Sequence, residues 1–292
     1  MAKPVVIAHR GASGYRPENT LAAFELGIQQ GADGIEFDLV ATKDDHLVIR
    51  HENALSSTTN ISRLPEFAKH QRAGIVEEVQ VTDWFSEDLS LDEIKKLRAI
   101  ERIPDLRPGS AKFDEQFSIP ALNEVLNSEF LSHKTMVVEI KRGSHTEKLS
   151  LHIGQLAAQE ILKSKVYEHN VNLIIESFDH EILMGAKKSM EALNLEAKYF
   201  FALDDTKLAE VDIVKLSMGL DGLAISMPML FSSDSWVRAA HGVGLDIWVY
   251  TARAEQAQTS IEEYYEHIIQ TGVDGIFADQ PDLLARVLAD RG

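Results

Sequence analysis

The sequence predicts an α/β protein built as a (β/α)8 TIM barrel, and three observations support this. Short apolar runs rich in Val, Ile and Phe alternate with segments of helical periodicity, the pattern of a parallel sheet. Eight such runs occur within 292 residues, which favours a closed barrel over an open doubly wound sheet. No repeat, low-complexity tract or linker interrupts the pattern, so residues 1–292 are expected to form a single catalytic domain.

The same alternation places each element. We expect the eight strands to end near His9, Asp38, Lys141, Phe178, Leu203, Met227, Tyr250 and Asp279. The clearest helices are expected over residues 20–30, 90–99, 147–165, 180–193, 235–241 and 255–271.

One apolar run, residues 47–51, does not fit the alternation. It begins only nine residues after Asp38, too soon for a helical crossover between parallel strands. The sequence Thr42-Lys43-Asp44-Asp45 is typical of a turn, so this run is expected to return as a hairpin strand near the barrel mouth.

After the second strand and its hairpin comes a long, irregular and charged segment, which we treat as an insertion over residues 54–118. It is too long for an ordinary connection between elements. Trp84 and Phe85 within it are expected to be exposed. The insertion is expected either to cover the catalytic face or to pack on the barrel rim, and both interpretations stay open.

Composition excludes several classes of function. The formal net charge of −17 disfavours nucleic acid and anionic membranes as partners. An anionic substrate would need a local reversal of charge, which a bound cation with Arg or Lys could provide. The chain has no cysteine, so disulfides and thiol nucleophiles are excluded.

The chain begins with Met1-Ala2-Lys3-Pro4 and runs directly into the first strand, without the regions of a signal peptide. We therefore expect a cytoplasmic protein, or a periplasmic or secreted one if a leader has been removed. No apolar run approaches membrane-spanning length, and no stable membrane association is predicted.

Chemically active side chains gather at the predicted carboxyl ends of strands, where the active sites of such barrels lie. They are His9, Arg10, Glu36, Asp38, Glu139, Lys141 and Phe178. Singly, each could be a helix cap, an ion-pair partner or a rim residue. Seven such groups at four strand ends favour an active site.

Period-two geometry puts Glu36 and Asp38 on one face of their strand, and Glu139 and Lys141 on one face of theirs. Three carboxylates converging in a barrel mouth would repel one another unless a cation joined them. Oxygen ligands indicate Mg²⁺ or Ca²⁺, and no zinc-type motif occurs.

Other motifs are weaker. Gly11-Ala12-Ser13-Gly14 could form a backbone phosphate nest, although it matches no phosphate-binding fingerprint. No GxSxG nucleophile elbow occurs. Trp248 and Tyr250 alternate on the seventh strand and could be either core or pocket wall.

At these residues the chain resembles the glycerophosphodiester phosphodiesterases, within the phospholipase-C-like phosphodiesterase barrels. The similarity lies in His9-Arg10-Gly11-Ala12-Ser13-Gly14, Pro17-Glu18-Asn19-Thr20, Gly31–Asp38, Thr42-Lys43-Asp44, His51 and Thr59-Asn60. Later echoes are Ile119-Pro120-Ala121-Leu122, Glu139-Ile140-Lys141, Ser177-Phe178-Asp179 and residues 272–282.

The resemblance implies a role for each matching residue. Glu36, Asp38 and Glu139 would bind the metal, while His9 and His51 would act as acid and base. Arg10 and Lys141 would hold the phosphate, and the remaining predicted substrate contacts are Asn19, Phe178, Tyr250 and Trp248. The implied reaction is hydrolysis of a glycerophosphodiester, such as glycerophosphocholine or glycerophosphoethanolamine, to glycerol 3-phosphate and an alcohol, within glycerol and lipid metabolism.

One imidazole would have to be neutral and the other charged, which predicts a bell-shaped pH profile. The nearby carboxylates are expected to raise both imidazole pKa values, and a metal to oppose them. Two positions depart from the family pattern: Glu52 stands where Asp is common, and Tyr250 stands where Trp is common. Both departures bear on substrate preference.

Three alternatives stay open. A related phosphodiesterase could act on lysophospholipid, teichoic-type or sphingolipid headgroups. The barrel could bind phosphate or glycerophosphodiesters without catalysis, or it could be an unrelated metal-dependent lyase or isomerase. The sequence does not indicate the oligomeric state or which histidine is the acid.

Overall fold

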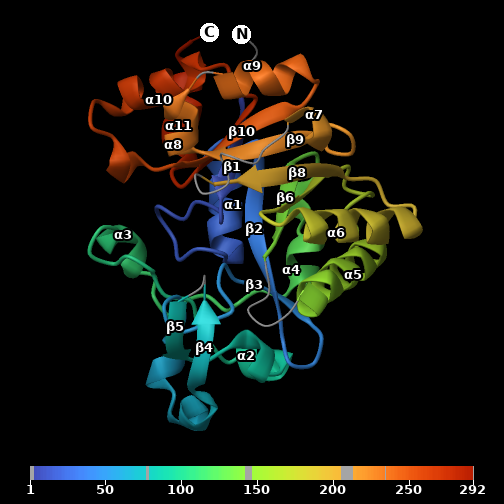
Figure 1. Ribbon diagram of the computed structural model, residues 1–292. Coiled ribbons are helices and arrows are strands. Elements are labelled where there is room, and N and C mark those ends of the chain that lie inside the picture. Colours follow the sequence, from blue (N-terminus) through green and yellow to red (C-terminus); the bar gives the residue numbers. More distant parts are fainter. Residues whose placement is uncertain (1–2, 77–78, 142–146, 205–212, 234, 292) are drawn as a thin grey trace.

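The computed structural model of the chain describes residues 3–76, 79–141, 147–204, 213–233 and 235–291. These residues form a closed barrel of eight parallel strands, confirming the predicted fold (Figure 1). The barrel strands, in spatial order, are β1 (Val5–His9), β2 (Gly34–Ala41), β6 (Thr135–Ile140), β7 (Asn172–Ser177), β8 (Lys198–Leu203), β9 (Gly222–Ser226), β10 (Asp246–Ala252) and β11 (Gly275–Ala278). Pairing of β11 with β1 closes the barrel.

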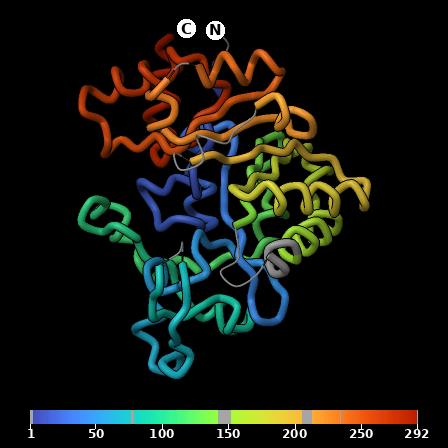
Figure 2. Tube along the Cα trace, in the orientation of Figure 1, coloured from blue at the N-terminus to red at the C-terminus, as the bar shows by residue number. Residues whose placement is uncertain are grey.

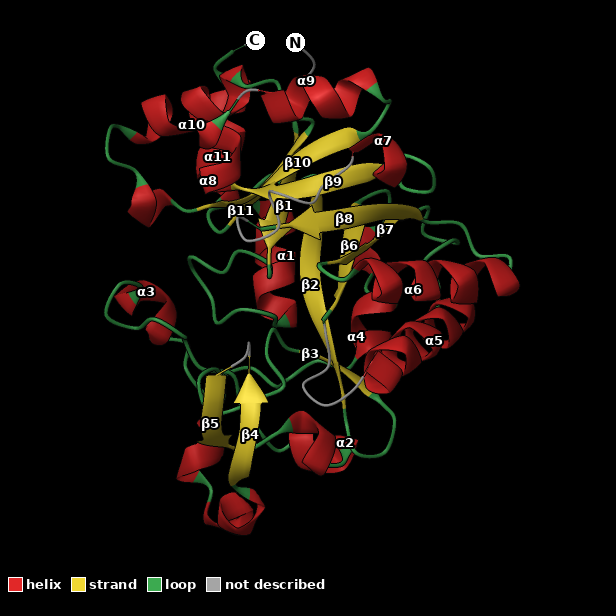
Figure 3. Cartoon of the chain, in the orientation of Figure 1, coloured by secondary structure: helices red, strands yellow, loops and turns green. Residues whose placement is uncertain are grey.

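Helices cover the outside of the strands (Figure 3). The α-helices outside the insertion are α1 (Leu21–Gln29), α4 (Leu122–Leu126), α5 (Glu147–Lys163), α6 (His180–Ala192), α7 (Ile213–Leu216), α8 (Met227–Ser232), α9 (Ser235–Gly242), α10 (Ile261–Gln270) and α11 (Pro281–Ala289). The single-turn 3₁₀ helices outside it are η4 (Glu129–Leu131) and η6 (Ala254–Gln256).

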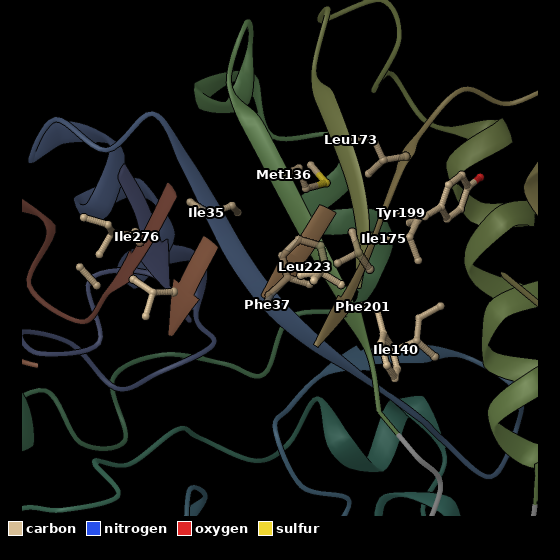
Figure 4. Packing of buried hydrophobic residues seen from close by; sticks show 14 of the residues in the cluster. Ile35, Phe37, Met136, Ile140, Leu173, Ile175, Tyr199, Phe201, Leu223 and Ile276 are labelled. Atoms are coloured by element: carbon tan, nitrogen blue, oxygen red, sulfur yellow. The ribbon is translucent and has the colours of Figure 1, made fainter. Parts of the chain in front are cut away.

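Strict alternation along the strands separates two sets of side chains. On β2, Ile35 and Phe37 point outward into the core beneath the helices, as Figure 4 shows for this and neighbouring strands. A second, smaller cluster fills the barrel interior with residues of the opposite parity, including Phe200 and Trp248. Glu36 and Asp38 share this inward parity, so the outer core fixes the direction in which the polar side chains point.

The predicted hairpin is confirmed. Strand β3 (Leu47–Ile49) pairs antiparallel with β2, and Leu39 lies opposite Ile49. The turn is held by Thr42, whose backbone N–H donates to the carbonyl of His46 at 2.8 Å. The hairpin brings His51 back toward the carboxyl end of β2.

Two helices are shorter than predicted. The helix expected over residues 90–99 is only α2 (Leu91–Ile94), which begins at a capping box between Ser90 and Glu93. It ends early because the following residues bridge to other segments of the insertion, Ala99 to Thr59 among them. The helix expected over residues 255–271 is α10, which begins only at Ile261. The Ser260 hydroxyl caps its first turn.

The insertion (residues 54–118) forms a lobe of its own at one end of the molecule (Figure 2). Its described elements are η1 (Asn60–Arg63), η2 (Pro65–His70), β4 (Arg72–Val76), β5 (Val79–Asp83), η3 (Ser86–Asp88), α2 and α3 (Pro108–Ala111). Residues 77 and 78 lie outside the described residues. A separate apolar cluster anchors the lobe on the β2–β3 hairpin through Val40 and Val48.

The prediction that Trp84 and Phe85 are exposed is wrong. Trp84 is 8% exposed, and its indole N–H donates to the carbonyl of Phe67 at 2.6 Å. Phe85 is fully buried, with the Arg72 guanidinium 4.1 Å from its ring centre. Both aromatics lie in the buried interior of the lobe, because an insertion of this size needs apolar packing of its own.

Among the described residues, no helix has both the length and the apolar character needed to cross a membrane.

Candidate active site

A cavity of about 520 Å³ opens at the carboxyl ends of the barrel strands. The predicted residues that line it are His9, Arg10, Glu36, His51, Glu139, Lys141, Phe178 and Tyr250. Asp38 lies fully buried beneath them, and Asn19 donates to its Oδ2 at 2.8 Å. The fold therefore brings together ten of the eleven residues predicted from the sequence.

Trp248 is the exception, and the structure does not place it at the mouth. Its ring packs inside the barrel, 4.9 Å from the ring centre of Phe200 and 5.6 Å from that of Phe277. It borders a different cavity together with Lys3, Thr135 and Asp274 near the amino-terminal ends of the strands. Trp248 points into the barrel, as Tyr250 does, but it lies two residues earlier on β10 and therefore deeper in the barrel. It is a core residue.

Glu36, Asp38 and Glu139 form a buried carboxylate cluster whose oxygens lie within 4.8 Å of one another. Burial, with Asp38 and Glu139 adding to it, raises the pKa of Glu36 well above its usual range. Burial and Asp38 raise the pKa of Glu139 to about 7, although Lys141 opposes this. For Asp38 the balance is reversed, since Lys141, His51 and Arg10 outweigh burial and hold its pKa well below its usual range.

This donor set fits a hard divalent cation. All three side chains offer oxygen ligands, and Oε1 of Glu36 has no hydrogen-bond partner among the described residues. Buried polar atoms are rarely left without a partner, so this oxygen is suited to serve as a ligand atom.

Lys141 and Arg10 place two cations beside the cluster. Nζ of Lys141 lies 3.0 Å from Oδ1 of Asp38 and 2.6 Å from Oε1 of Glu139. The Arg10 backbone N–H donates to Oε2 of Glu36 at 3.0 Å, while its guanidinium lies 3.1 Å from Glu18. Arg10 adopts the left-handed conformation, with φ of 54°, a strain typical of functional sites.

His9 presents one ring nitrogen to the cluster and the other to a carboxylate. Its Nδ1 lies 2.6 Å from Oδ1 of Asp279, and its Nε2 lies 3.9 Å from Oε2 of Glu36. Burial and the charge of Arg10 lower the pKa of His9, despite the opposing effect of Asp279.

His51 repeats this arrangement with the residue that follows it. Its Nδ1 lies 2.5 Å from Oε1 of Glu52. Burial, Lys141 and Arg10 lower the pKa of His51 to about 4. The neighbouring carboxylates raise both imidazole pKa values, as expected, but burial and the nearby cations outweigh them, so the net shift of both values is downward.

An apolar wall faces this polar half of the cavity. The rings of Phe178 and Tyr250 meet edge to face, with their centres 5.5 Å apart. The Tyr250 hydroxyl donates to the carbonyl of Leu203 at 2.6 Å, which fixes the ring. Met227 and Phe231 from α8 extend the wall.

The phosphate nest suggested for residues 11–14 is not present. All four backbone N–H groups donate within the protein, that of Ser13 to Gly11 at 2.8 Å and that of Gly14 to Asp279 at 2.8 Å. The loop instead packs tightly, since a Cβ on Gly11 would lie 2.5 Å from the backbone of Ala23.

Sequence reasoning missed five charged residues that support the site, namely Glu18, Arg102, Arg107, Glu176 and Asp279. Period two on β11 puts Asp279 on the same face as Phe277, and this signal could have found it. Glu176 has inward parity on β7, where it lies opposite Glu139 in register. Burial and Glu139 raise the pKa of Glu176 well above its usual range.

Comparisons with known proteins find one family over nearly the whole chain. The model of the glycerophosphoryl diester phosphodiesterase family matches residues 9–283. A glycerophosphodiester phosphodiesterase of Caldanaerobacter subterraneus is 31% identical, over 99% of this chain and 100% of that one. One of Bacillus subtilis is 30% identical, over 97% of this chain and 86% of its own.

A solved structure of an Oleispira antarctica phosphodiesterase, in complex with the product sn-glycerol-3-phosphate, has the same fold. It is 23% identical, with a TM-score of 0.71, and the match covers 98% of this chain and 97% of that one.

Proposed function

The chain belongs to the glycerophosphoryl diester phosphodiesterase family, and we propose that it hydrolyses glycerophosphodiesters to glycerol 3-phosphate and an alcohol in a metal-dependent reaction. Glycerophosphocholine and glycerophosphoethanolamine are the substrates proposed first. The observation that supports this best is the meeting of three kinds of group at one cavity: a buried carboxylate cluster, two cations and two imidazoles.

In this proposal Glu36, Asp38 and Glu139 hold one divalent cation, Mg²⁺ or Ca²⁺. When bound, the cation supplies positive charge that draws electrons from the phosphoryl group. It would also relieve the repulsion that raises the pKa values of Glu36 and Glu139.

Arg10 and Lys141 neutralise the charge that grows on the phosphoryl oxygens in the transition state. A guanidinium can contact two oxygens at once, whereas the ammonium acts as a point charge. Both cations are ion-paired inside the chain, so they are held in place before the substrate arrives. Asn19 supports this arrangement through its hydrogen bond to Asp38.

The two imidazoles move the protons. One takes a proton from the attacking hydroxyl as the new P–O bond forms, and the other gives a proton to the alkoxide as the old P–O bond breaks. In both histidines Nδ1 faces a carboxylate, which favours the tautomer with the proton on Nδ1 and a free lone pair on Nε2. The nucleophile is either water or the neighbouring glycerol hydroxyl, the latter through a cyclic phosphate.

The apolar wall of Phe178 and Tyr250 is proposed to contact the alcohol part of the substrate. Tyr250 is smaller than the tryptophan common in the family, so the wall leaves more room for the alcohol.

The test is product release from protein stripped with a chelator and then supplied with Mg²⁺ or Ca²⁺. Glycerophosphocholine, glycerophosphoethanolamine and a lysophospholipid are compared, and ³¹P NMR distinguishes glycerol 3-phosphate from a cyclic product. His9→Gln should abolish turnover, whereas His46→Gln, an exposed histidine in the β2–β3 turn, should not. Turnover of the lysophospholipid alone would overturn the proposed substrate class.

A further inference from the structure

We propose that the insertion positions both catalytic histidines, because it supplies one arginine to the carboxylate behind each imidazole. Arg102 holds Glu52, which holds His51, and Arg107 holds Asp279, which holds His9. This inference rests on the proposed function, since it assigns the two imidazoles to acid–base catalysis.

Arg102 joins two carboxylates of the site. Its Nη1 and Nη2 donate to the two oxygens of Glu52 at 2.8 and 2.7 Å. Its Nε and Nη2 donate to the two oxygens of Glu18 at 2.9 and 2.7 Å. Glu18 in turn contacts the guanidinium of Arg10 at 3.1 Å. One guanidinium therefore fixes the partner of an imidazole and the partner of a phosphate-binding cation.

Arg107 is buried, with 7% of its surface exposed, and contacts the carboxylate beside His9. Its Nη2 lies 2.5 Å from Oδ2 of Asp279, and its Nη1 donates to the carbonyl of Ser13 at 3.1 Å. The Ser13 hydroxyl donates to the carbonyl of His9 at 2.9 Å. Arg107 thus contacts the partner of His9 and also the loop that follows His9.

Both carboxylates are held at both oxygens. Oδ1 of Asp279 faces His9, while Oδ2 receives Arg107 and also Arg253 at 3.0 Å. Both oxygens of Glu52 receive Arg102, and Oε1 also faces His51. A carboxylate fixed in this way cannot rotate, so it holds the plane and tautomer of the imidazole beside it.

The barrel itself provides only part of this support. Asp279 has a second cation from the barrel, Arg253, but that side chain is more than a third exposed. Arg102 is the cation paired with Glu52 among the described residues. The two arginines lie five residues apart in one short stretch of the insertion, so this stretch contacts both histidine–carboxylate pairs.

The test uses the full chain with Arg102→Ala, Arg107→Ala, and the Lys variant of each. Arg63→Ala is the matched control, because Arg63 is also in the insertion and pairs with Glu115 at the surface. We measure kcat and KM on glycerophosphocholine, and the low-field ¹H NMR resonances of the imidazole Nδ1–H groups. His9→Gln and His51→Gln assign these resonances.

Arg107→Ala should lower kcat at least tenfold with KM within about twofold, and should shift or broaden the His9 resonance alone. Arg102→Ala should affect the His51 resonance, and should lower kcat and raise KM together, since Arg10 also loses its support. Lys at either position should restore part of the loss but not all of it, because an ammonium cannot form the paired contacts of a guanidinium.

A double variant separates positioning from a general loss of structure. If Arg107 acts through Asp279, then Arg107→Ala should cost less than threefold further in kcat when it is added to Asp279→Asn. The inference would be overturned if the effects of Arg107→Ala and Asp279→Asn on kcat were fully additive. It would also be overturned if the arginine variants kept the imidazole resonances unchanged and kcat within twofold of wild type. If an Ala variant does not fold, the Lys variant and its NMR spectrum decide. Absence of wild-type turnover on any glycerophosphodiester would instead refute the proposed function, and the resonances would still test the positioning.

Discussion

Oδ1 of Asp279 lies 2.6 Å from Nδ1 of His9, although 270 residues separate the two in the chain. Closure of the barrel explains this, because β11 pairs with β1 and both residues follow the inward parity of their strands. The first and last strands together therefore build one histidine–carboxylate pair.

Asp279→Asn should lower kcat by about 10²–10⁴ with a small change in KM. The amide keeps the shape of the side chain but can donate to Nδ1, which would favour the tautomer that lacks the lone pair on Nε2. Steady-state kinetics on glycerophosphocholine measure the effect. Asp282→Asn is the control, since Asp282 contacts the Tyr15 hydroxyl instead. A kcat within threefold of wild type would show that Asp279 does not position His9.

Glu36→Gln should stabilise the metal-free protein and remove its response to metal. It takes away one of three mutually repelling carboxylates, a gain of about 1–3 kcal/mol in the free energy of unfolding. For a chain of this size that raises Tm by about 2–6 °C. Wild type, in contrast, should gain Tm when Mg²⁺ or Ca²⁺ is added.

Thermal unfolding with and without metal measures both effects. Glu262→Gln, an exposed glutamate that pairs with Arg286, is the matched control and should change neither. A metal-dependent rise in Tm that survives Glu36→Gln would place the cation elsewhere.

The pH profile of kcat/KM should be bell-shaped with its maximum below pH 6.5. The base must be neutral, so activity rises as pH increases through the pKa of the base. The acid must be charged, so activity falls as pH increases through the pKa of the acid. Both imidazole pKa values lie below 6.5 in the free chain, that of His51 at about 4. A plateau that extends above pH 8 would contradict this assignment.

A diester with an aryl leaving group should identify the acid. An aryl oxide leaves without a proton, so loss of the acid costs little with this substrate, whereas loss of the base costs as much as before. For one of the two variants, His9→Gln or His51→Gln, we expect the loss of kcat relative to wild type to be at least tenfold smaller with the aryl diester than with glycerophosphocholine. For the other variant we expect the same loss with both substrates. Equal recovery of both variants would contradict a division of labour between the two imidazoles.

Gly11→Ala should destabilise the chain by about 2–4 kcal/mol, because Gly11 has φ of 80° and its Cβ would meet the backbone of Ala23. Relief of this clash would also move Arg10 and its bond to Glu36. Gly109→Ala is the control, since no atom lies within 4 Å of the position that a Cβ would take there. Urea unfolding measures both, and equal stabilities would contradict the packing described for this loop.

The barrel and most of its mouth are predictable from the sequence because both depend on local alternation. Along β2, apolar Ile35 and Phe37 alternate with Glu36 and Asp38, so the pattern fixes both the strand and the direction of its carboxylates. Alternation predicts whether a side chain points into the barrel, but it does not predict how deep in the barrel that side chain lies. For this reason it cannot distinguish Trp248, in the core, from Tyr250, at the mouth.

The supporting shell cannot be predicted in the same way. Arg107 contacts Asp279 across 172 residues, and Arg102 contacts Glu18 across 84. Neither arginine belongs to a periodic segment, so no local pattern marks it. The burial of Trp84 and Phe85 escapes prediction for a similar reason, since the residues that contact them, Phe67 in η2 and Arg72 in β4, lie more than ten residues away in other elements of the insertion.

The most direct test of metal-dependent hydrolysis is release of glycerol 3-phosphate from glycerophosphocholine by chelator-treated protein, before and after addition of Mg²⁺ or Ca²⁺. We predict negligible turnover without metal, turnover restored by metal, and no restoration in Glu36→Ala or His9→Ala. Full turnover after chelation, or turnover that either variant retains, would contradict the proposed roles of the carboxylate cluster and of His9.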